Sequence, residues 1–286
     1  MSEKDENWRL ARFRNADGLD IAYRDRPESS MPPVLMLHGL TRNSLDFADL
    51  AAHLAPRFRS IAMDVRGRGA SDRDPDPARY HIGSYVADAF ALLDRLGIAR
   101  AILIGTSMGG LMSMTMGAMA PERISAIVLN DIGPVIEPAG LARIRGYVGP
   151  SLPARDWAEA RERMKAINAD ALPGLDEPAW DRFTRRLSIE TADGILPAYD
   201  PAIASTMQSG EAIPGDLWPL WQALGTIPIL ALRGEQSDIL SSGTLARMKE
   251  SHPDCTVATI ADRGHAPLLD EPDALSAIDG FLKRFL

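Results

Sequence analysis

A serine placed between glycines, in the segment "IGTSMGG", is the first group in this chain that could do chemistry. Gly105, Ser107 and Gly109 follow an apolar run and precede a second apolar segment. This pattern is typical of a sharp strand-to-helix turn that presents the hydroxyl beside backbone N–H groups of the helix. A serine hydroxyl also needs a base to remove its proton and donors to stabilise an oxyanion. Ser107 is therefore a candidate nucleophile, and its partners must come from elsewhere in the chain.

Two residues near the end of the chain are the expected partners of this serine. Asp238 follows the apolar run "IPILAL" in "RGEQSD", and His265 follows "TVATI" in "ADRGHAPLLDEP". If both runs are parallel strands, the loops after them reach the same sheet edge as Ser107. We therefore predict a triad of Ser107 as nucleophile, His265 as base and Asp238 as acid. Asp131, at the end of "SAIVLN", is a rival acid, and we favour Asp238 for its place in the "GEQSD" loop.

The elements that would position these residues alternate along most of the chain. We expect a hairpin around "NADGLD", strands at 34–39, 60–65, 101–105, 125–130, 227–232 and 256–260, and helices at 43–54, 84–96, 108–119, 242–251 and from 273 onward. Short, fully apolar strands alternating with helices are typical of a mostly parallel sheet covered on both faces. The fold class is therefore predicted to be α/β.

The segment from Ala101 to Pro121 contains no charged side chain and is long enough to cross a bilayer. It holds four glycines and several hydroxyls, however, and no second candidate span accompanies it. We interpret it as a buried strand followed by a buried helix, with Ser107 between them. The methionines from Met108 to Met119 are expected to fill the core beneath the serine.

The alternation breaks between about residues 134 and 215, where we expect helices and no strand. Asp156, Pro178 and the segment "DPAIASTM" each provide a helix-start signal. We interpret residues 134–215, called here the lid segment, as a helical insertion after the sixth strand of a core made of 1–133 and 216–286. Trp157 and Trp180 of the lid segment are candidate substrate-pocket residues. His38, at the end of its strand, is a further candidate, although we favour a structural hydrogen-bonding role for it near the floor of the active site. Other side chains that could line the pocket or pack around it are Ile136, Ile144, Tyr147, Phe183, Met207, Trp218 and Trp221.

Composition limits the possible ligands. The formal net charge is −8 and no long basic run occurs, so neither a nucleic acid nor an anionic membrane is an expected partner. The single cysteine, Cys255, excludes an internal disulfide, and no histidine pair has metal-ligand spacing. We expect a small-molecule substrate, no metal and no cofactor. The acidic N-terminal segment shows no signal-peptide pattern, which predicts a cytoplasmic protein.

Taken together, "LHGL", "DVRGRGASD", "GTSMGG", "RGEQSD" and "GHAPLLDEP" make the chain resemble the α/β-hydrolase family, in particular lid-bearing esterases and lactonases. The resemblance covers nearly the whole chain. It implies hydrolysis of a small carboxylic ester or lactone through an acyl-enzyme, with no cofactor. It also implies an oxyanion hole made by the backbone N–H groups of Leu40 and Met108. Arg66 and Asp72 are expected to brace their glycine-rich loop.

Other functions share this fold and stay open at this point. A serine at the turn argues against haloalkane dehalogenases and epoxide hydrolases, which resemble the fold but use aspartate there. The same triad could cleave a carbon–carbon bond in a ring-cleavage diketone, cleave an amide, or form a peracid without a cofactor. A non-catalytic receptor that kept the fold is the alternative from a different class. The oligomeric state stays open as well.

Overall fold

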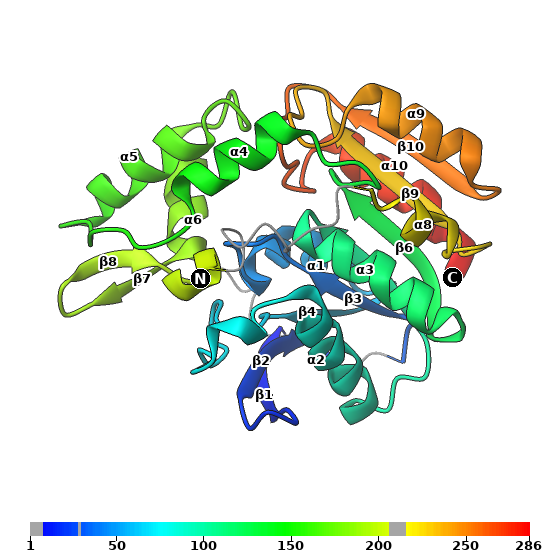
Figure 1. Ribbon diagram of the computed structural model, residues 1–286, viewed down its shortest axis with the longest axis horizontal. Coiled ribbons are helices and arrows are strands. Elements are labelled where there is room, and N and C mark those ends of the chain that lie inside the picture. Colours follow the sequence, from blue (N-terminus) through cyan, green and yellow to red (C-terminus); the bar gives the residue numbers. More distant parts are fainter. Residues whose placement is uncertain (1–7, 28–29, 206–215) are drawn as a thin grey trace.

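The computed structural model describes residues 8–27, 30–205 and 216–286. Its centre is an eight-stranded sheet in the order β1-β2-β4-β3-β5-β6-β9-β10 (Figure 1). The antiparallel strands β1 (Arg9–Arg14) and β2 (Asp20–Asp25) form one edge, and β2 is antiparallel to β4. All neighbours from β4 to β10 run parallel: β4 (Arg59–Met63), β3 (Pro33–Leu37), β5 (Ala101–Thr106), β6 (Ile124–Asn130), β9 (Ile229–Gly234) and β10 (Cys255–Ile260). The mostly parallel α/β fold is confirmed.

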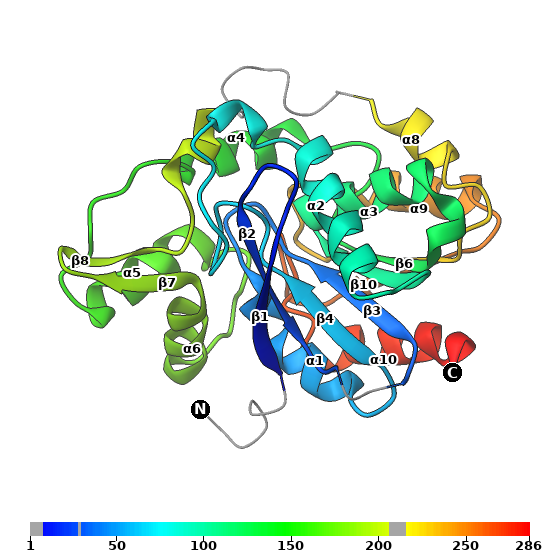
Figure 2. The ribbon, with the colours of Figure 1, turned by 90° about the horizontal axis from the view of Figure 1, so that it is seen from below.

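Helices cover both faces of this sheet (Figure 2). On one face lie α2 (Ile82–Arg95), α3 (Met108–Met119), α8 (Trp218–Gln222) and α9 (Ser242–Ser251), and on the other α1 (Ala48–Leu54) and α10 (Pro272–Leu282). Alternate residues of β5 divide between the two cores, with Leu103 on the α3 side and Ile102 and Ile104 on the α1 side. Because both faces are buried, the central strands β3 and β5 are apolar along nearly their whole length.

Register aligns the carboxyl ends of the parallel strands. Leu37 of β3 pairs with Gly105 of β5, and Thr106 pairs with Asn130 of β6. Asn130 in turn lies opposite Leu232 of β9, so the loops that follow all of these strands emerge at one edge. Ligands bind at this edge in open α/β sheets.

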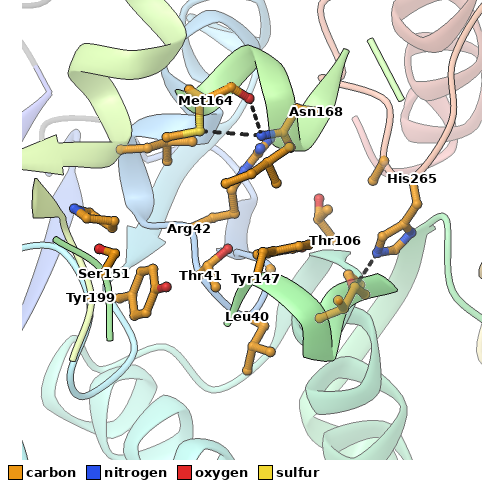
Figure 3. A pocket seen from close by; sticks show the side chains of 17 residues that line it. Leu40, Thr41, Arg42, Thr106, Tyr147, Ser151, Met164, Asn168, Tyr199 and His265 are labelled. Carbon is orange, nitrogen blue, oxygen red and sulfur yellow. Dashed lines mark hydrogen bonds between the residues drawn. The ribbon is translucent and has the colours of Figure 1, made fainter. Parts of the chain in front are cut away.

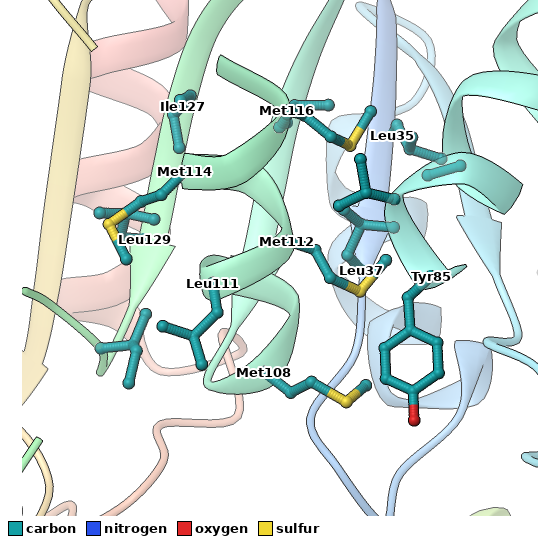
Figure 4. Packing of buried hydrophobic residues seen from close by; sticks show 14 of the residues in the cluster. Leu35, Leu37, Tyr85, Met108, Leu111, Met112, Met114, Met116, Ile127 and Leu129 are labelled. Atoms are coloured by element: carbon teal, nitrogen blue, oxygen red, sulfur yellow. The ribbon is translucent and has the colours of Figure 1, made fainter. Parts of the chain in front are cut away.

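The charge-free stretch from Ala101 to Pro121 is β5 followed by α3, at the centre of the molecule. Met112, Met114 and Met116 are fully buried and pack among sheet and helix side chains such as Leu37 and Leu129 (Figure 4). Among the described residues, no helix is long and apolar enough to span a membrane. The expected core-filling role is confirmed for these three methionines and for the buried Met108. It is wrong for Met119, which lies at the end of α3 and is 67% exposed.

The lid segment leaves the sheet after β6 and contains α4 (Pro138–Tyr147), α5 (Trp157–Asn168) and α6 (Glu177–Leu187). Asp156 caps α5 by accepting a hydrogen bond from the Glu159 N–H, as expected. The prediction of no strand was wrong, because β7 (Ser188–Thr191) and β8 (Gly194–Pro197) form an antiparallel hairpin. Its strands are only four residues long, and Ile195 is the one buried residue among them, so they lack the apolar pattern that marks a core strand.

Candidate active site

Ser107 stands at a strained turn between β5 and α3. Its φ of 52° lies in the left-handed region, which is uncommon for a residue with a side chain. The turn brings α3 so close to the sheet that a Cβ on Gly109 would collide with the backbone of Leu37, and one on Gly105 with the backbone of Gly109. Both glycines are therefore required by packing, and the turn lifts the Ser107 hydroxyl to the sheet edge.

His265 connects the serine to a buried carboxylate. Its Nε2 lies 2.8 Å from Ser107 Oγ, and its Nδ1 lies 2.8 Å from an oxygen of Asp131. An ionised carboxylate only accepts hydrogen bonds, so Nδ1 carries a proton and donates it to Asp131. Nε2 is then free to accept the serine proton. This is the geometry of a nucleophile, a base and an acid acting in series.

The predicted contact between His265 and Asp238 was wrong, and the rival Asp131 holds the position. The Asp238 carboxylate instead receives two hydrogen bonds from the Arg143 guanidinium, at 2.6 and 2.8 Å, and is about a third exposed. That guanidinium holds the pKa of Asp238 below its ordinary value. Asp238 is therefore engaged in an ion pair with helix α4, and the hydrogen bond to the imidazole is made by Asp131 instead.

Asp131 is held by the loop that was expected to supply the acid. One of its oxygens accepts the Gly234 N–H at 2.8 Å, and the other accepts the Ser237 hydroxyl at 2.6 Å besides the His265 N–H. The Asp131 side chain is fully buried. Ser237 was missed by the sequence analysis; its position beside Asp238 in "GEQSD" is the only signal for it.

The loop after β3 lies beside the serine. A Cβ on Gly39 would lie 3.7 Å from the Cβ of Ser107, so the backbone leading to Leu40 passes close to the nucleophile. Met108 is the first residue of α3, and its N–H belongs to the free N-terminal turn of that helix. The positions of Leu40 and Met108 are compatible with two backbone donors that converge on Ser107.

Arg68 touches both of these residues and was not singled out from the sequence. Its Nε donates to the Leu40 carbonyl at 2.9 Å, and a terminal nitrogen lies 3.8 Å from the Met108 sulfur. The side chain is buried over the rings of Tyr80 and Tyr85, and no carboxylate of the described chain pairs with it. It therefore places a buried positive charge behind the two backbone donors.

The glycine-rich loop that carries Arg68 is braced as expected. The buried Arg66 guanidinium forms ion pairs with Asp74 and Asp88. Asp72 accepts the backbone N–H of Asp20. Neither Arg66 nor Asp72 lines a cavity beside Ser107.

His38 has the structural hydrogen-bonding role that the sequence analysis favoured, and it lines neither cavity beside Ser107. It is fully buried, its Nε2 accepts the Val65 N–H at 3.0 Å, and its Nδ1 donates to the Gly39 carbonyl at 2.7 Å. Burial lowers its pKa from 6.5 to about 3, so the ring stays neutral. It ties the loop before Leu40 to the strand beside it.

This depressed pKa predicts a pH-dependent stability. The unfolded chain takes up a proton on His38 near pH 6.5, whereas the folded chain takes it up only near pH 3. The contribution of neutral His38 to the free energy of unfolding is therefore complete above pH 6.5. Between pH 6.5 and about pH 3 it falls on acidification by about 1.4 kcal/mol per pH unit. Urea unfolding at pH 7 and pH 5 should show a larger loss in wild type than in His38→Gln. Equal losses in the two proteins would contradict this assignment.

Two cavities meet at Ser107. The first, of about 120 Å³, is lined by Gly39, Leu40, Thr41, Arg42, Thr106, Ser107, Ile144, Tyr147, Ser151, Met164, Ile167, Asn168, Leu187, Pro197, Tyr199, His265 and Ala266 (Figure 3). The second, of about 90 Å³, is lined by Leu40, Tyr80, His81, Ile82, Tyr85, Ser107, Met108, Leu111, Ile132, Ile136, Leu141, Ile144 and Ile239. We call them the polar cavity and the apolar cavity. Leu40, Ser107 and Ile144 line both.

The tryptophans expected in the pocket pack elsewhere. Trp180 is buried with Phe183 in a separate small core of the lid segment, and Trp157 packs on Ala160 and Ile195. Neither tryptophan lines either cavity beside Ser107, so their prediction as pocket residues was wrong. Of the other candidates, Ile136, Ile144 and Tyr147 line the cavities, Phe183, Trp218 and Trp221 pack in cores, and Met207 lies outside the described residues.

Other reactive groups do not compete with Ser107. Burial and the charge of Asp254 raise the pKa of Cys255 to about 12, so its thiol is not ionised near neutral pH. No cluster of histidine, cysteine and acidic residues that could hold a metal ion occurs in the described ranges.

The chain belongs to the family with the alpha/beta hydrolase fold, whose model matches residues 32–272. It is 31% identical over 271 residues to the 3-hydroxybutyrate-oligomer hydrolase of Cupriavidus necator, an alignment that covers 91% of this chain and 92% of that protein. It is 30% identical over 273 residues to the 2-(acetamidomethylene)succinate hydrolase of Mesorhizobium japonicum, with 94% of each covered. The crystal structure of an alpha/beta hydrolase from Novosphingobium aromaticivorans matches with a TM-score of 0.91 at 42% identity, over 97% of this chain and 99% of that one.

Proposed function

We propose that the protein is a serine hydrolase that cleaves a small carboxylic ester through an acyl-enzyme, with Ser107, His265 and Asp131 as its triad. The observation that carries the proposal is the continuous chain of hydrogen bonds from Ser107 Oγ through both nitrogens of His265 to the buried Asp131. Membership of a hydrolase family supports the same reading.

In the first half of the proposed reaction, Ser107 Oγ attacks the acyl carbon while His265 Nε2 takes its proton. The N–H groups of Leu40 and Met108 would stabilise the oxyanion, each at a typical value of about 3 kcal/mol. Asp131 stabilises the imidazolium through Nδ1. When the intermediate collapses, His265 gives its proton to the departing alcohol oxygen.

In the second half, water takes the place of the alcohol. His265 removes a proton from water, the hydroxide attacks the acyl carbon on Ser107, and the oxyanion again lies against the same two N–H groups. Collapse releases the carboxylic acid and returns the proton to Ser107. In each half of the reaction, His265 Nε2 takes up one proton and later gives one back. Nε2 lies 2.8 Å from Ser107 Oγ, so this one nitrogen can carry out the proton transfers of both halves.

The ester bond is supported by the relatives and the site together. The Cupriavidus necator relative is named for hydrolysis of 3-hydroxybutyrate oligomers, in which hydroxy acids are joined by ester bonds. The Mesorhizobium japonicum relative is named for a different substrate, so the family supports hydrolysis and the first relative supports the bond. We also propose residues 134–215 as a lid, because its α4 and α5 supply Ile144, Tyr147 and Asn168 to the polar cavity.

A serine-directed reagent tests this proposal. An uncharged aryl phosphonate ester is expected to react once per chain, at Ser107, and to abolish the turnover of p-nitrophenyl butyrate. Peptide mass mapping locates the adduct. Cys255→Ala is the matched control, since removal of this thiol should leave both the turnover and the labelling of Ser107 intact. Labelling at another residue, or full turnover after stoichiometric labelling of Ser107, would refute the nucleophile.

A further inference from the structure

Ser107 lies where two cavities of different chemistry meet, so the two parts of a substrate cleaved there would lie in different cavities. This inference rests on the proposed serine hydrolysis. In an acyl-enzyme mechanism the alcohol part leaves after the first half, whereas the acyl part stays on the serine. The two parts therefore extend from the reacting carbon in different directions. The structure offers two directions that differ in chemistry.

His265 decides which direction belongs to the alcohol. The departing oxygen must receive its proton from His265 Nε2, so the alcohol part has to lie on the side of that nitrogen. His265 lines the polar cavity and does not line the apolar one. Figure 3 shows His265 pointing into the polar cavity, with its hydrogen bond to Ser107 drawn as a dashed line. The alcohol part is thereby placed in the polar cavity.

The apolar cavity is suited to the acyl chain. It is lined by aliphatic side chains of α3, α4 and nearby loops, among them Leu111, Ile132, Ile136 and Leu141, and by both proposed oxyanion residues, Leu40 and Met108. Among the described residues, no aspartate, glutamate, lysine or arginine lines it, and its polar side chains are those of Tyr80, His81, Tyr85 and Ser107. At about 90 Å³ it is small, which limits the acyl chain to a short one.

Arg42 gives the polar cavity a positive charge. It is the only lysine or arginine that lines this cavity in the described chain, and no aspartate or glutamate lines it. Nε of Arg42 donates to Asp46 at 2.7 Å, and the guanidinium stacks 4.4 Å from the centre of the Phe183 ring. These contacts fix the plane of the group. Its two terminal nitrogens make no hydrogen bond to another described residue.

The same arginine lies close to the nucleophile. A Cβ on Gly39 would lie 3.5 Å from Cγ of Arg42 and 3.7 Å from Cβ of Ser107, so both side chains start beside one glycine. Asn168 of α5 also lines this cavity, where its side-chain amide nitrogen donates to the Met164 carbonyl (Figure 3). Paired terminal N–H donors of arginine match the two oxygens of a carboxylate.

We infer that the substrate is an ester with a short apolar acyl group in the apolar cavity and an alcohol part that carries a carboxylate bound by Arg42. The test uses butanoyl esters of ω-hydroxycarboxylates with one, two or three methylenes, each compared with its neutral primary amide. For at least one spacing, kcat/KM should favour the carboxylate by about tenfold or more.

Substitution of Arg42 separates charge recognition from general damage. In Arg42→Gln the carboxylate-to-amide ratio of kcat/KM should fall to near one, and Arg42→Lys should keep part of it. Arg145→Gln, which removes an exposed arginine of α4 outside both cavities, should keep the wild-type ratio. A wild-type ratio near one at every spacing, or a ratio unaffected by Arg42→Gln, overturns the role of Arg42.

A second pair of variants tests the acyl assignment. Ile136→Trp narrows the apolar cavity and should lower the hexanoate-to-acetate ratio of kcat/KM by about tenfold or more. Ile167→Trp narrows the polar cavity and should leave that ratio unchanged. The reverse pattern would overturn the assignment. If no ester is hydrolysed, or if Ser107→Ala is as active as wild type, the proposed function is wrong. If esters are hydrolysed through Ser107 without the expected carboxylate and acyl-chain preferences, only the assignment of the two cavities is wrong.

Discussion

Replacing Ser107 with alanine is expected to lower kcat for ester hydrolysis by about 10⁴-fold or more. Alanine removes the oxygen that forms the covalent bond, while the rest of the lining of both cavities is kept. Substrate binding should therefore change little, and the loss should fall on kcat. The measurement is steady-state turnover of p-nitrophenyl butyrate by purified wild type and variant.

The fold of this variant needs a separate check, because Ser107 has a φ of 52°. Alanine in that conformation carries strain similar to that of serine, so the thermal unfolding midpoints should be close. Cys255→Ala serves as the control for loss of another potential nucleophile. A folded Ser107→Ala protein with wild-type turnover would show that the hydrolysis does not proceed through this serine.

The second large effect is expected at Asp131. Asp131→Asn should lower kcat by about 10³- to 10⁴-fold, as loss of the acid does in serine hydrolases of this mechanism. The asparagine oxygen would still accept hydrogen bonds, but the amide group adds a donor among Gly234, Ser237 and His265, which all donate to the present carboxylate. A donor facing Nδ1 favours the tautomer with its proton on Nε2, which cannot accept from Ser107.

Asp238→Asn provides the matched comparison for this prediction. It removes the same charge from a different loop, where the carboxylate is partly exposed to solvent and pairs with Arg143. We therefore expect kcat to stay within about threefold of wild type. The pair of variants decides between the two acids. A crippled Asp238→Asn enzyme beside an active Asp131→Asn enzyme would restore the order favoured by the sequence alone.

The sequence predicts the central sheet well because its signals are local. The run from Ala101 to Gly105 is apolar at every position, and the helix that follows was bounded correctly at Met108 and Met119. The glycines at 105 and 109 likewise predicted the turn that presents Ser107. Burial of both faces of a parallel sheet leaves this pattern in any such chain.

The acid could not be chosen by such local signals. Asp131 and Asp238 both follow apolar strands, and both loops open at the same edge. The choice depends on how far the His265 loop reaches across the sheet and on Arg143, which arrives from the lid segment to occupy Asp238. Those are contacts between distant parts of the chain, which spacing does not encode.

The pocket residues were unpredictable for a related reason. Trp157 and Trp180 belong to a set of lid side chains whose sequence pattern does not distinguish pocket lining from packing, and in the structure they form the lid segment's own small cores. Arg42, by contrast, lies in a loop whose sequence, "LTRNS", contains no periodic pattern. Its place in the cavity follows from the path of the chain after Gly39.

The most direct test of the central claim is to catch the acyl group on the protein. Wild-type enzyme mixed with excess p-nitrophenyl butyrate and quenched in acid within the first turnovers should gain the mass of one butanoyl group, and peptide mapping should place it on Ser107. Ser107→Ala treated in the same way should gain none. Hydrolysis of the ester with no adduct on Ser107, under conditions that trap the acyl-enzyme of a known serine esterase, would contradict the account.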